Sequence, residues 1–235
     1  MVSKTTRPST PTPPPEPTKR TGLWIAVGVG VVIAIVGLAA ILTSRDDSEL
    51  SVGTATCDVA SSSSPLEPAE TWPVTVTGTA LPALPDSGTD PAIGTAAPTL
   101  CGRFFDGTPV NVDPAKGPAM LVFLAHWCPH CNREAPELMK WKASGNVPDG
   151  LQVIGVTTAV ATNREHYPPS TWILDEMKWT WPVLADSPNS DAFTAMGGSG
   201  FPYVVIVGSD GKVLDRWSGE LGGAAIEARV AAALA

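Results

Sequence analysis

The sequence predicts an α/β fold, in which a mixed central sheet is covered by helices on both faces. Three observations carry this prediction. The apolar run 119–125 has the length and composition of a buried strand, and Pro129 directly after it suits the first turn of a helix. A second apolar strand is expected at 151–157. The chain then closes with a predicted hairpin at 203–217 and a helix at 224–234, whose apolar residues repeat on one face.

Shorter elements complete the predicted order, and no internal repeat is present. In chain order we expect two strands at 97–100 and 104–110 around an Asp-Gly turn, a helix from Pro129 to about Lys142, a loop at 159–169, a short helix at 171–178 and a strand at 181–185. Alternation of strand and helix up to this point is what places helices on both faces of the sheet.

Outside this region, the composition predicts appendages to a single domain. The chain has 235 residues, of which 43% are hydrophobic. Residues 1–20 are rich in Pro, Thr and Ser and predict a disordered tail. Residues 23–43 are almost wholly apolar and lie in an uncharged stretch, so the sequence predicts one transmembrane helix at 21–44. An extracytoplasmic linker is expected at 45–91, with one short strand at 73–77, and a folded domain at 92–235.

Charge predicts the direction of this membrane helix. Basic residues predominate before the apolar stretch and acidic residues follow it, so the positive-inside rule puts the N-terminus in the cytoplasm and the domain outside. A cleaved signal peptide is the alternative, and it exports the domain equally. The formal net charge is −8, and the basic tail makes the exported part more acidic still. This balance argues against nucleic acid as a partner.

The motif Cys128-Pro129-His130-Cys131 carries the predicted chemistry. At a helix N-terminus, unpaired backbone N–H groups and the helix dipole favour a thiolate, and His130 adds positive charge or a hydrogen bond. We therefore expect Cys128 to be the nucleophile and Cys131 to resolve the mixed disulfide. Half of a zinc site has the same spacing, but the chain has no second cysteine pair.

The remaining cysteines, Cys57 and Cys101, are isolated in the sequence. Outside the cytoplasm they could pair as a structural disulfide that staples the linker to the domain. Two unpaired thiols, or exchange of Cys101 with the active-site pair, are the alternatives. The sequence leaves all three open.

Neighbouring residues make the motif more specific. Trp127 precedes the first cysteine, Pro136 falls five residues after the second, and Phe201-Pro202 comes shortly before the apolar run 203–207. With these features, residues 93–235 resemble the thioredoxin superfamily, most closely its membrane-anchored, extracytoplasmic TlpA/ResA-like branch. The Cys-Pro-His-Cys sequence is similar to that of DsbA. The resemblance implies a thioredoxin-like fold with an added N-terminal hairpin.

The resemblance also implies roles for single residues. Phe201-Pro202 would be the cis-proline loop that faces the cysteines and, with Trp127, contacts the client, whose extended chain could pair with the backbone of Phe201. Glu134 matches an acidic position of the TlpA-like branch, where it would relay a proton to the second cysteine, or it is a surface residue of the helix. Val122 stands where thioredoxins carry a buried Asp.

The other two histidines are not expected to take part in the chemistry. His126 is expected to be a solvated loop residue. His166, beside Tyr167-Pro168-Pro169, is expected to be structural or exposed. Trp127 is expected to shield the sulfur atoms with its ring.

These features together predict a membrane-tethered thiol-disulfide oxidoreductase with no cofactor beyond its redox-active Cys128–Cys131 pair. Expected partners are exported protein thiols or disulfides, a membrane redox partner and the bilayer. The TlpA/ResA resemblance implies a reductant, whereas Cys-Pro-His-Cys and Val122 favour an oxidant or isomerase. The alternative function is a Sco-type copper chaperone that binds the metal through Cys128, Cys131 and a histidine. Peroxide reduction is disfavoured because no peroxidase-like cysteine motif stands elsewhere in the chain.

Overall fold

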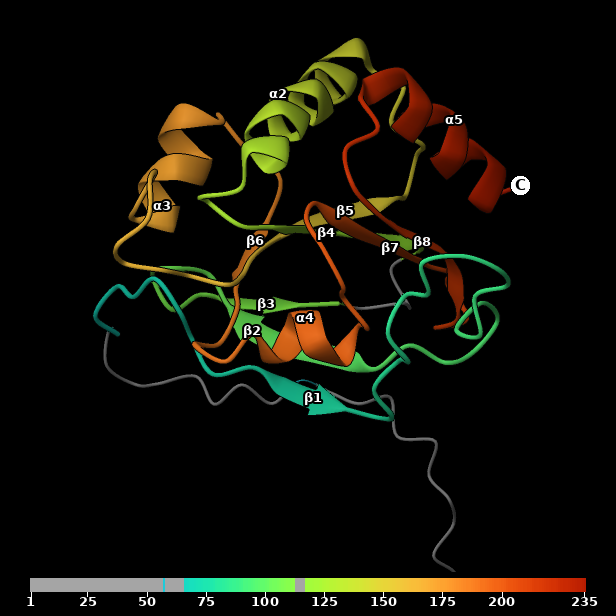
Figure 1. Cartoon of the computed structure of the whole chain (residues 1–235), viewed down its shortest axis with the longest axis horizontal. Helices are drawn as coiled ribbons and strands as arrows, with labels where there is room; N and C mark the ends of the chain where they lie inside the picture. The colour runs from blue at the N-terminus through green and yellow to red at the C-terminus, as the bar shows by residue number, and fades with distance from the viewer. Residues whose placement is uncertain (1–56, 58–65, 113–116) are drawn as a thin grey trace, which may run out of the picture. The chain divides into compact units, whose positions relative to one another are not determined.

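A mixed sheet of eight strands forms the centre of the computed structural model, which describes residues 57, 66–112 and 117–235. The strand order is β1-β2-β6-β5-β4-β7-β8, with β3 paired to β2 (Figure 1). Strands β4, β5 and β6 are parallel, and all the other pairs are antiparallel. The strands are β1 (Thr75–Thr77), β2 (Thr99–Arg103), β3 (Pro109–Asn111), β4 (Ala119–Leu124), β5 (Gln152–Thr157), β6 (Val183–Ala185), β7 (Tyr203–Val207) and β8 (Val213–Ser218).

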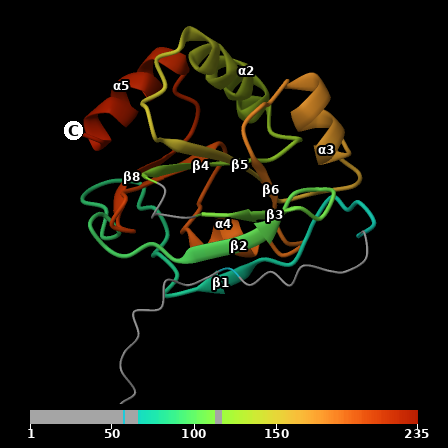
Figure 2. The same ribbon diagram turned by 180° about the vertical axis from the view of Figure 1, so that it is seen from behind.

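Helices cover both faces of the sheet, as predicted. On one side α2 (Pro129–Ser144) packs against α5 (Gly223–Ala233), and α3 (Pro169–Thr171) lies on the other flank of α2 and continues as a π-helical turn, Trp172–Glu176. On the other side lies α4 (Asp191–Ala195), near β1 (Figure 2). The alternating directions of side chains in a strand supply both faces with core residues.

Strand β4 connects the two layers of the core. All six of its residues are buried. Its even-numbered side chains, such as Val122, pack in the same cluster as Cys128 and Cys131, and its odd-numbered ones, such as Phe123, pack on the opposite face. Strands β5 and β7 flank its two edges, and a core cluster packs on each of its faces, which explains why its sequence is a continuous apolar run.

Most predicted elements are confirmed within two residues of their expected ends. The region 171–178 differs, because its helix begins at Pro169 and turns π-helical at Trp172. Helix α4 was not predicted, since its five residues are too short to show a helical period. The strand expected at 104–110 is also shorter, because residues 104–108 form the turn between β2 and β3.

The predicted linker is wrong over residues 66–91, which pack onto the domain. Strand β1 pairs with β2, the side chain of Leu81 is 7% exposed, and Asp90 forms an ion pair with the buried Arg216. A disulfide joins Cys57 to Cys101 in β2, with a Cα–Cα distance of 5.4 Å. Of the three possibilities for these cysteines, the structure therefore shows the structural disulfide. The domain begins well before residue 92.

The predicted tail at 1–20 and membrane helix at 21–44 lie outside the described residues. Among the residues that the structure does describe, none belongs to a helix that is both apolar and long enough to cross a bilayer.

Candidate active site

The two cysteines of the motif lie where β4 passes into α2. Cys128 is the N-cap of α2, Pro129 is its first residue, and the N–H of Cys128 donates to the carbonyl of Ala125 at 2.9 Å. Both thiols are free in this structure, and Cys128 is 5% exposed whereas Cys131 is completely buried. The helix therefore presents one sulfur towards the surface and encloses the other.

The environment separates the pKa values of the two thiols. A hydrogen bond from the Cys131 thiol is the largest of several effects that lower the pKa of Cys128 from 9.0 to about 6. The backbone N–H groups of Cys131 and His130 and the positive charge of His130 act in the same direction, and burial opposes them. The same hydrogen bond, together with burial, raises the pKa of Cys131. Cys128 is thus the thiol that ionises at neutral pH, and its partner keeps its proton.

Among the single causes that lower the pKa of Cys128, the hydrogen bond from the Cys131 thiol is larger than either backbone N–H bond and larger than the charge of His130, on which the sequence-based prediction relied.

The proline loop faces the reactive sulfur. The Phe201–Pro202 peptide bond is cis, and the Cys128 sulfur lies 3.8 Å from the carbonyl oxygen of Phe201, which accepts a hydrogen bond from it when the thiol is protonated. The loop is held in place because β7 follows at once and pairs with β4. The ring of Phe201 packs edge-on against Trp127, with centroids 5.9 Å apart, and lies 4.6 Å from the ring of Phe193. The predicted cis-proline and its position are both confirmed.

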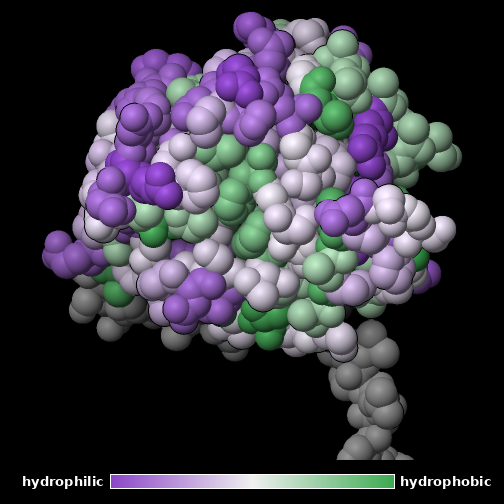
Figure 3. Space-filling view, viewed as in Figure 1, coloured by the Kyte–Doolittle hydropathy of each residue, from purple (hydrophilic) through white to green (hydrophobic). Residues whose placement is uncertain are grey.

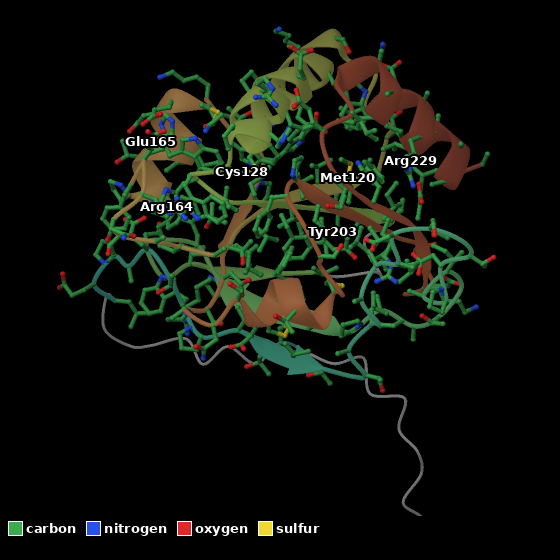
Figure 4. All side chains as sticks on the ribbon, in the orientation of Figure 1. Met120, Cys128, Arg164, Glu165, Tyr203 and Arg229 are labelled. Atoms are coloured by element: carbon green, nitrogen blue, oxygen red, sulfur yellow. A yellow bond between two sulfur atoms is a disulfide. The ribbon has the colours of Figure 1, made fainter. Side chains whose placement is uncertain are left out.

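A surface pocket of about 440 Å³ lies beside this loop. It is lined by His130, Phe201 and the four residues Gly219–Gly222. Figure 3 shows an apolar strip in the middle of one face, between hydrophilic flanks, and Figure 4, in the same orientation, shows Cys128 at the start of α2. A segment of another protein bound in the pocket would lie alongside the carbonyl of Phe201.

Polar side chains at the rim connect α2 to the segment Gly219–Gly222. Arg133 donates to both carboxylate oxygens of Glu220 through Nε, and His130 Nδ1 lies 3.1 Å from Glu220 Oε2. The Arg133 guanidinium is the main reason that the pKa of Glu220 is lowered. Glu220 lies 90 residues from His130 in the sequence, and no local pattern could have identified it.

Glu134 lies on the inner face of α2, one turn after Cys131. Its side chain is completely buried, which excludes the alternative that it is a surface residue of the helix. Its carboxylate accepts hydrogen bonds from the N–H groups of Leu221 and Gly222, but burial outweighs these bonds and raises its pKa. The charge of Glu134 also contributes to raising the pKa of Cys131. This position is compatible with the predicted proton relay, which stays a prediction.

The remaining predicted residues are placed as follows. Trp127 is half-buried, and its Nε1 donates to the carbonyl of Ala159 at 2.8 Å. His126 is buried, so the expectation of a solvated residue is wrong. His166 is exposed and forms an ion pair with Glu176, in line with its prediction. Val122 is enclosed in β4 on the face that carries the cysteines.

Comparison with known proteins identifies the family. A model of the AhpC/TSA family matches residues 93–216, more than half of the chain. The chain belongs to the AhpC/TSA family. As a member of this family with a dithiol at the N-terminus of α2, the protein is a thiol-disulfide oxidoreductase.

Several solved structures are similar to this AhpC/TSA protein. The thioredoxin domain of a thiol-disulfide oxidoreductase from Bacteroides vulgatus is 24% identical, with a TM-score of 0.48, over 61% of this chain and 99% of that one. A thiol:disulfide interchange protein from Chlorobium tepidum is 23% identical, with a TM-score of 0.49, over 60% and 97%. StoA from Bacillus subtilis is 15% identical, with a TM-score of 0.48, over 60% and 99%. These values are too low to carry an assignment. No curated protein matches the chain.

Proposed function

We propose that the protein is a membrane-anchored, extracytoplasmic thiol-disulfide oxidoreductase of the TlpA/ResA-like kind, which exchanges disulfides with cysteines of exported proteins. One observation carries the proposal: the Cys128 sulfur lies beside the carbonyl of Phe201, a residue that lines a surface pocket. A peptide that pairs with this backbone would bring its own sulfur to Cys128 whatever its side chains are.

The chemistry needs only the two cysteines. In the oxidising direction a client thiolate attacks the Cys128 sulfur of the Cys128–Cys131 disulfide, and the Cys131 sulfur leaves and takes up a proton. A second client thiolate then attacks the client sulfur of the mixed disulfide and releases Cys128 as a thiolate. The client gains a disulfide, and the protein becomes a dithiol. Regeneration requires an oxidant, for which we propose a membrane redox partner. The reducing direction reverses each step.

The thiol pKa favours an oxidant of intermediate strength. Stabilising the thiolate stabilises the reduced protein, which makes its disulfide more oxidising. Thioredoxin has a thiol pKa of about 7 and a reduction potential of about −270 mV, whereas DsbA has values of about 3.5 and about −120 mV. With a Cys128 pKa of about 6, we expect a potential between these two limits. Val122, at the position where thioredoxins carry a buried Asp, agrees with this direction.

Two features support the proposed location. The Cys57–Cys101 disulfide is of a kind that persists in oxidising compartments and is rare in the cytosol. The apolar stretch 23–43 is long enough to span a bilayer, and the charges around it favour an external domain.

The test uses the full chain in membranes. Protease added outside should release the domain, and the pure protein should oxidise a reduced test protein in a glutathione buffer. Stoichiometric copper in the purified protein without disulfide exchange would favour the copper chaperone instead, and rapid peroxide consumption would favour a peroxidase. In the described part of the chain, no three His, Cys, Asp or Glu side chains are grouped as metal ligands.

A further inference from the structure

His126 is buried between the active-site strand and a distant loop. It directly follows the apolar run 119–125, two residues before Cys128, and only 1% of its surface is exposed. Its Nδ1 lies 2.7 Å from the carbonyl oxygen of Glu165, and its Nε2 lies 3.2 Å from the amide nitrogen of Ala161. Both ring nitrogens therefore contact the backbone of one segment, Ala159–Glu165, which we call the 159–165 loop.

These two partners fix the tautomer of the ring. A carbonyl oxygen only accepts, so Nδ1 carries the hydrogen, and a backbone N–H only donates, so Nε2 carries the lone pair. The ring is thus held as a neutral imidazole, with its proton on Nδ1. An alanine, leucine or protonated histidine at this position could not make the same pair of bonds.

The neighbouring Trp127 is attached to the same loop. Its Nε1 donates to Ala159, and the guanidinium of Arg164 lies over its ring, 5.4 Å from the centroid. The same ring packs edge-on against Phe201, which lines the pocket. The 159–165 loop therefore reaches the pocket through Trp127 and Phe201.

The loop is also exposed enough to meet a large partner. Residues 162–165 are exposed, and among the described residues no carboxylate forms an ion pair with Arg164. Figure 4 shows Arg164 and Glu165 beside α3, and Cys128 at the adjoining end of α2. The segment Gly219–Gly222 borders the pocket beside His130.

We propose that His126 is a positioning residue for protein clients: its two hydrogen bonds hold the 159–165 loop and Trp127 as a second wall of the client-binding site, beside the pocket lined by Gly219–Gly222. The inference rests on the proposed function and extends it. A small disulfide needs only the exposed edge of Cys128. A protein segment also touches the walls, so the loop distinguishes proteins from small thiols.

The test compares two substrates in the full-length protein. In His126→Leu, which keeps apolar volume but loses both hydrogen bonds, KM for a reduced protein client should rise about tenfold, because each lost bond weakens loop placement. The kcat for that client, and the rate with oxidised glutathione, should stay within about twofold. His126→Asn keeps a side-chain N–H for Glu165 and should recover part of the loss. His166→Gln, which removes the exposed histidine next to the loop, is the matched control and should leave both substrates unaffected.

Two spectroscopic readouts follow the loop directly. In the native protein, the imidazole ¹⁵N signals should show the hydrogen on Nδ1 of His126, and the Ala161 amide should exchange slowly with solvent. In His126→Asn, which serves if the leucine variant does not fold, that amide should exchange faster. An equal rise in KM for glutathione and protein, a fall in kcat alone, or an Nε2–H tautomer would overturn the inference. A native protein that exchanges with neither substrate would instead refute the proposed function.

Discussion

Replacing Cys131 by alanine should remove the main cause of the reactivity of Cys128. The hydrogen bond from the Cys131 thiol is the largest reason that the pKa of Cys128 is about 6 rather than 9.0. Holding the pKa there stabilises the thiolate relative to the thiol by about 4 kcal/mol. A hydrogen bond to a charged group contributes about 1.5–3 kcal/mol, which corresponds to roughly 1 to 2 pH units. We therefore expect the pKa of Cys128 to rise to about 7 or 8 in Cys131→Ala, because the backbone N–H groups of the helix remain.

The pH dependence of thiolate absorbance, checked by the rate of alkylation, measures this pKa. At neutral pH about nine-tenths of Cys128 should be ionised in the native protein, and at most about half in the alanine variant. Cys131→Ser is the matched control, because its hydroxyl still donates a hydrogen bond and should keep the pKa near that of the native protein. An alanine variant that titrates like the native protein would refute the assignment to Cys131. A native value close to about 8.5, which is that of a free cysteine, would refute the whole electrostatic account.

Three further outcomes concern stability and the buried acids and bases. Cys57→Ser opens a loop with a sequence separation of 44 and should lower the free energy of unfolding by about 4 kcal/mol in a denaturant titration; a loss below about 1 kcal/mol would contradict it. Burial lowers the pKa of His126, so the contribution of this residue to folding stability is complete above about pH 6.5 and is lost as the pH falls below that value. In His126→Gln the free energy of unfolding should therefore depend less on pH in the acid range, and an unchanged dependence would contradict this role of His126. The charge of Glu134 raises the pKa of Cys131, so Glu134→Gln should let Cys131 be alkylated at lower pH in a Cys128→Ser background. An unchanged dependence of the alkylation rate on pH would show that Glu134 does not influence the ionisation of Cys131.

The centre of the active site was predictable because its signals are local. A continuous apolar run, a proline at the first turn of a helix and the spacing of two cysteines lie within residues 119–131, so no knowledge of distant contacts was needed. The proline loop is distant in sequence, and only its resemblance to a known family identified it. Base rates for X-Pro bonds would have predicted trans.

Other features depend on contacts that a sequence does not record. His126 looks like a polar residue at the end of a strand, but the 159–165 loop closes over it and supplies partners for both nitrogens. Residues 66–91 have the composition of a linker, yet the backbone bonds of β1 and the ion pair of Asp90 attach them to the domain. Backbone pairing leaves little trace in composition, and therefore the start of the domain was misplaced.

Equilibration of the purified protein with glutathione buffers, followed by quenching and mass analysis of alkylated cysteines, tests the central claim most directly. We expect Cys128 and Cys131 to pass reversibly between dithiol and disulfide, with a midpoint between about −270 and −120 mV, while Cys57 and Cys101 remain oxidised throughout. A Cys128–Cys131 pair that stays reduced at every glutathione ratio, or forms only glutathione adducts, would contradict the account.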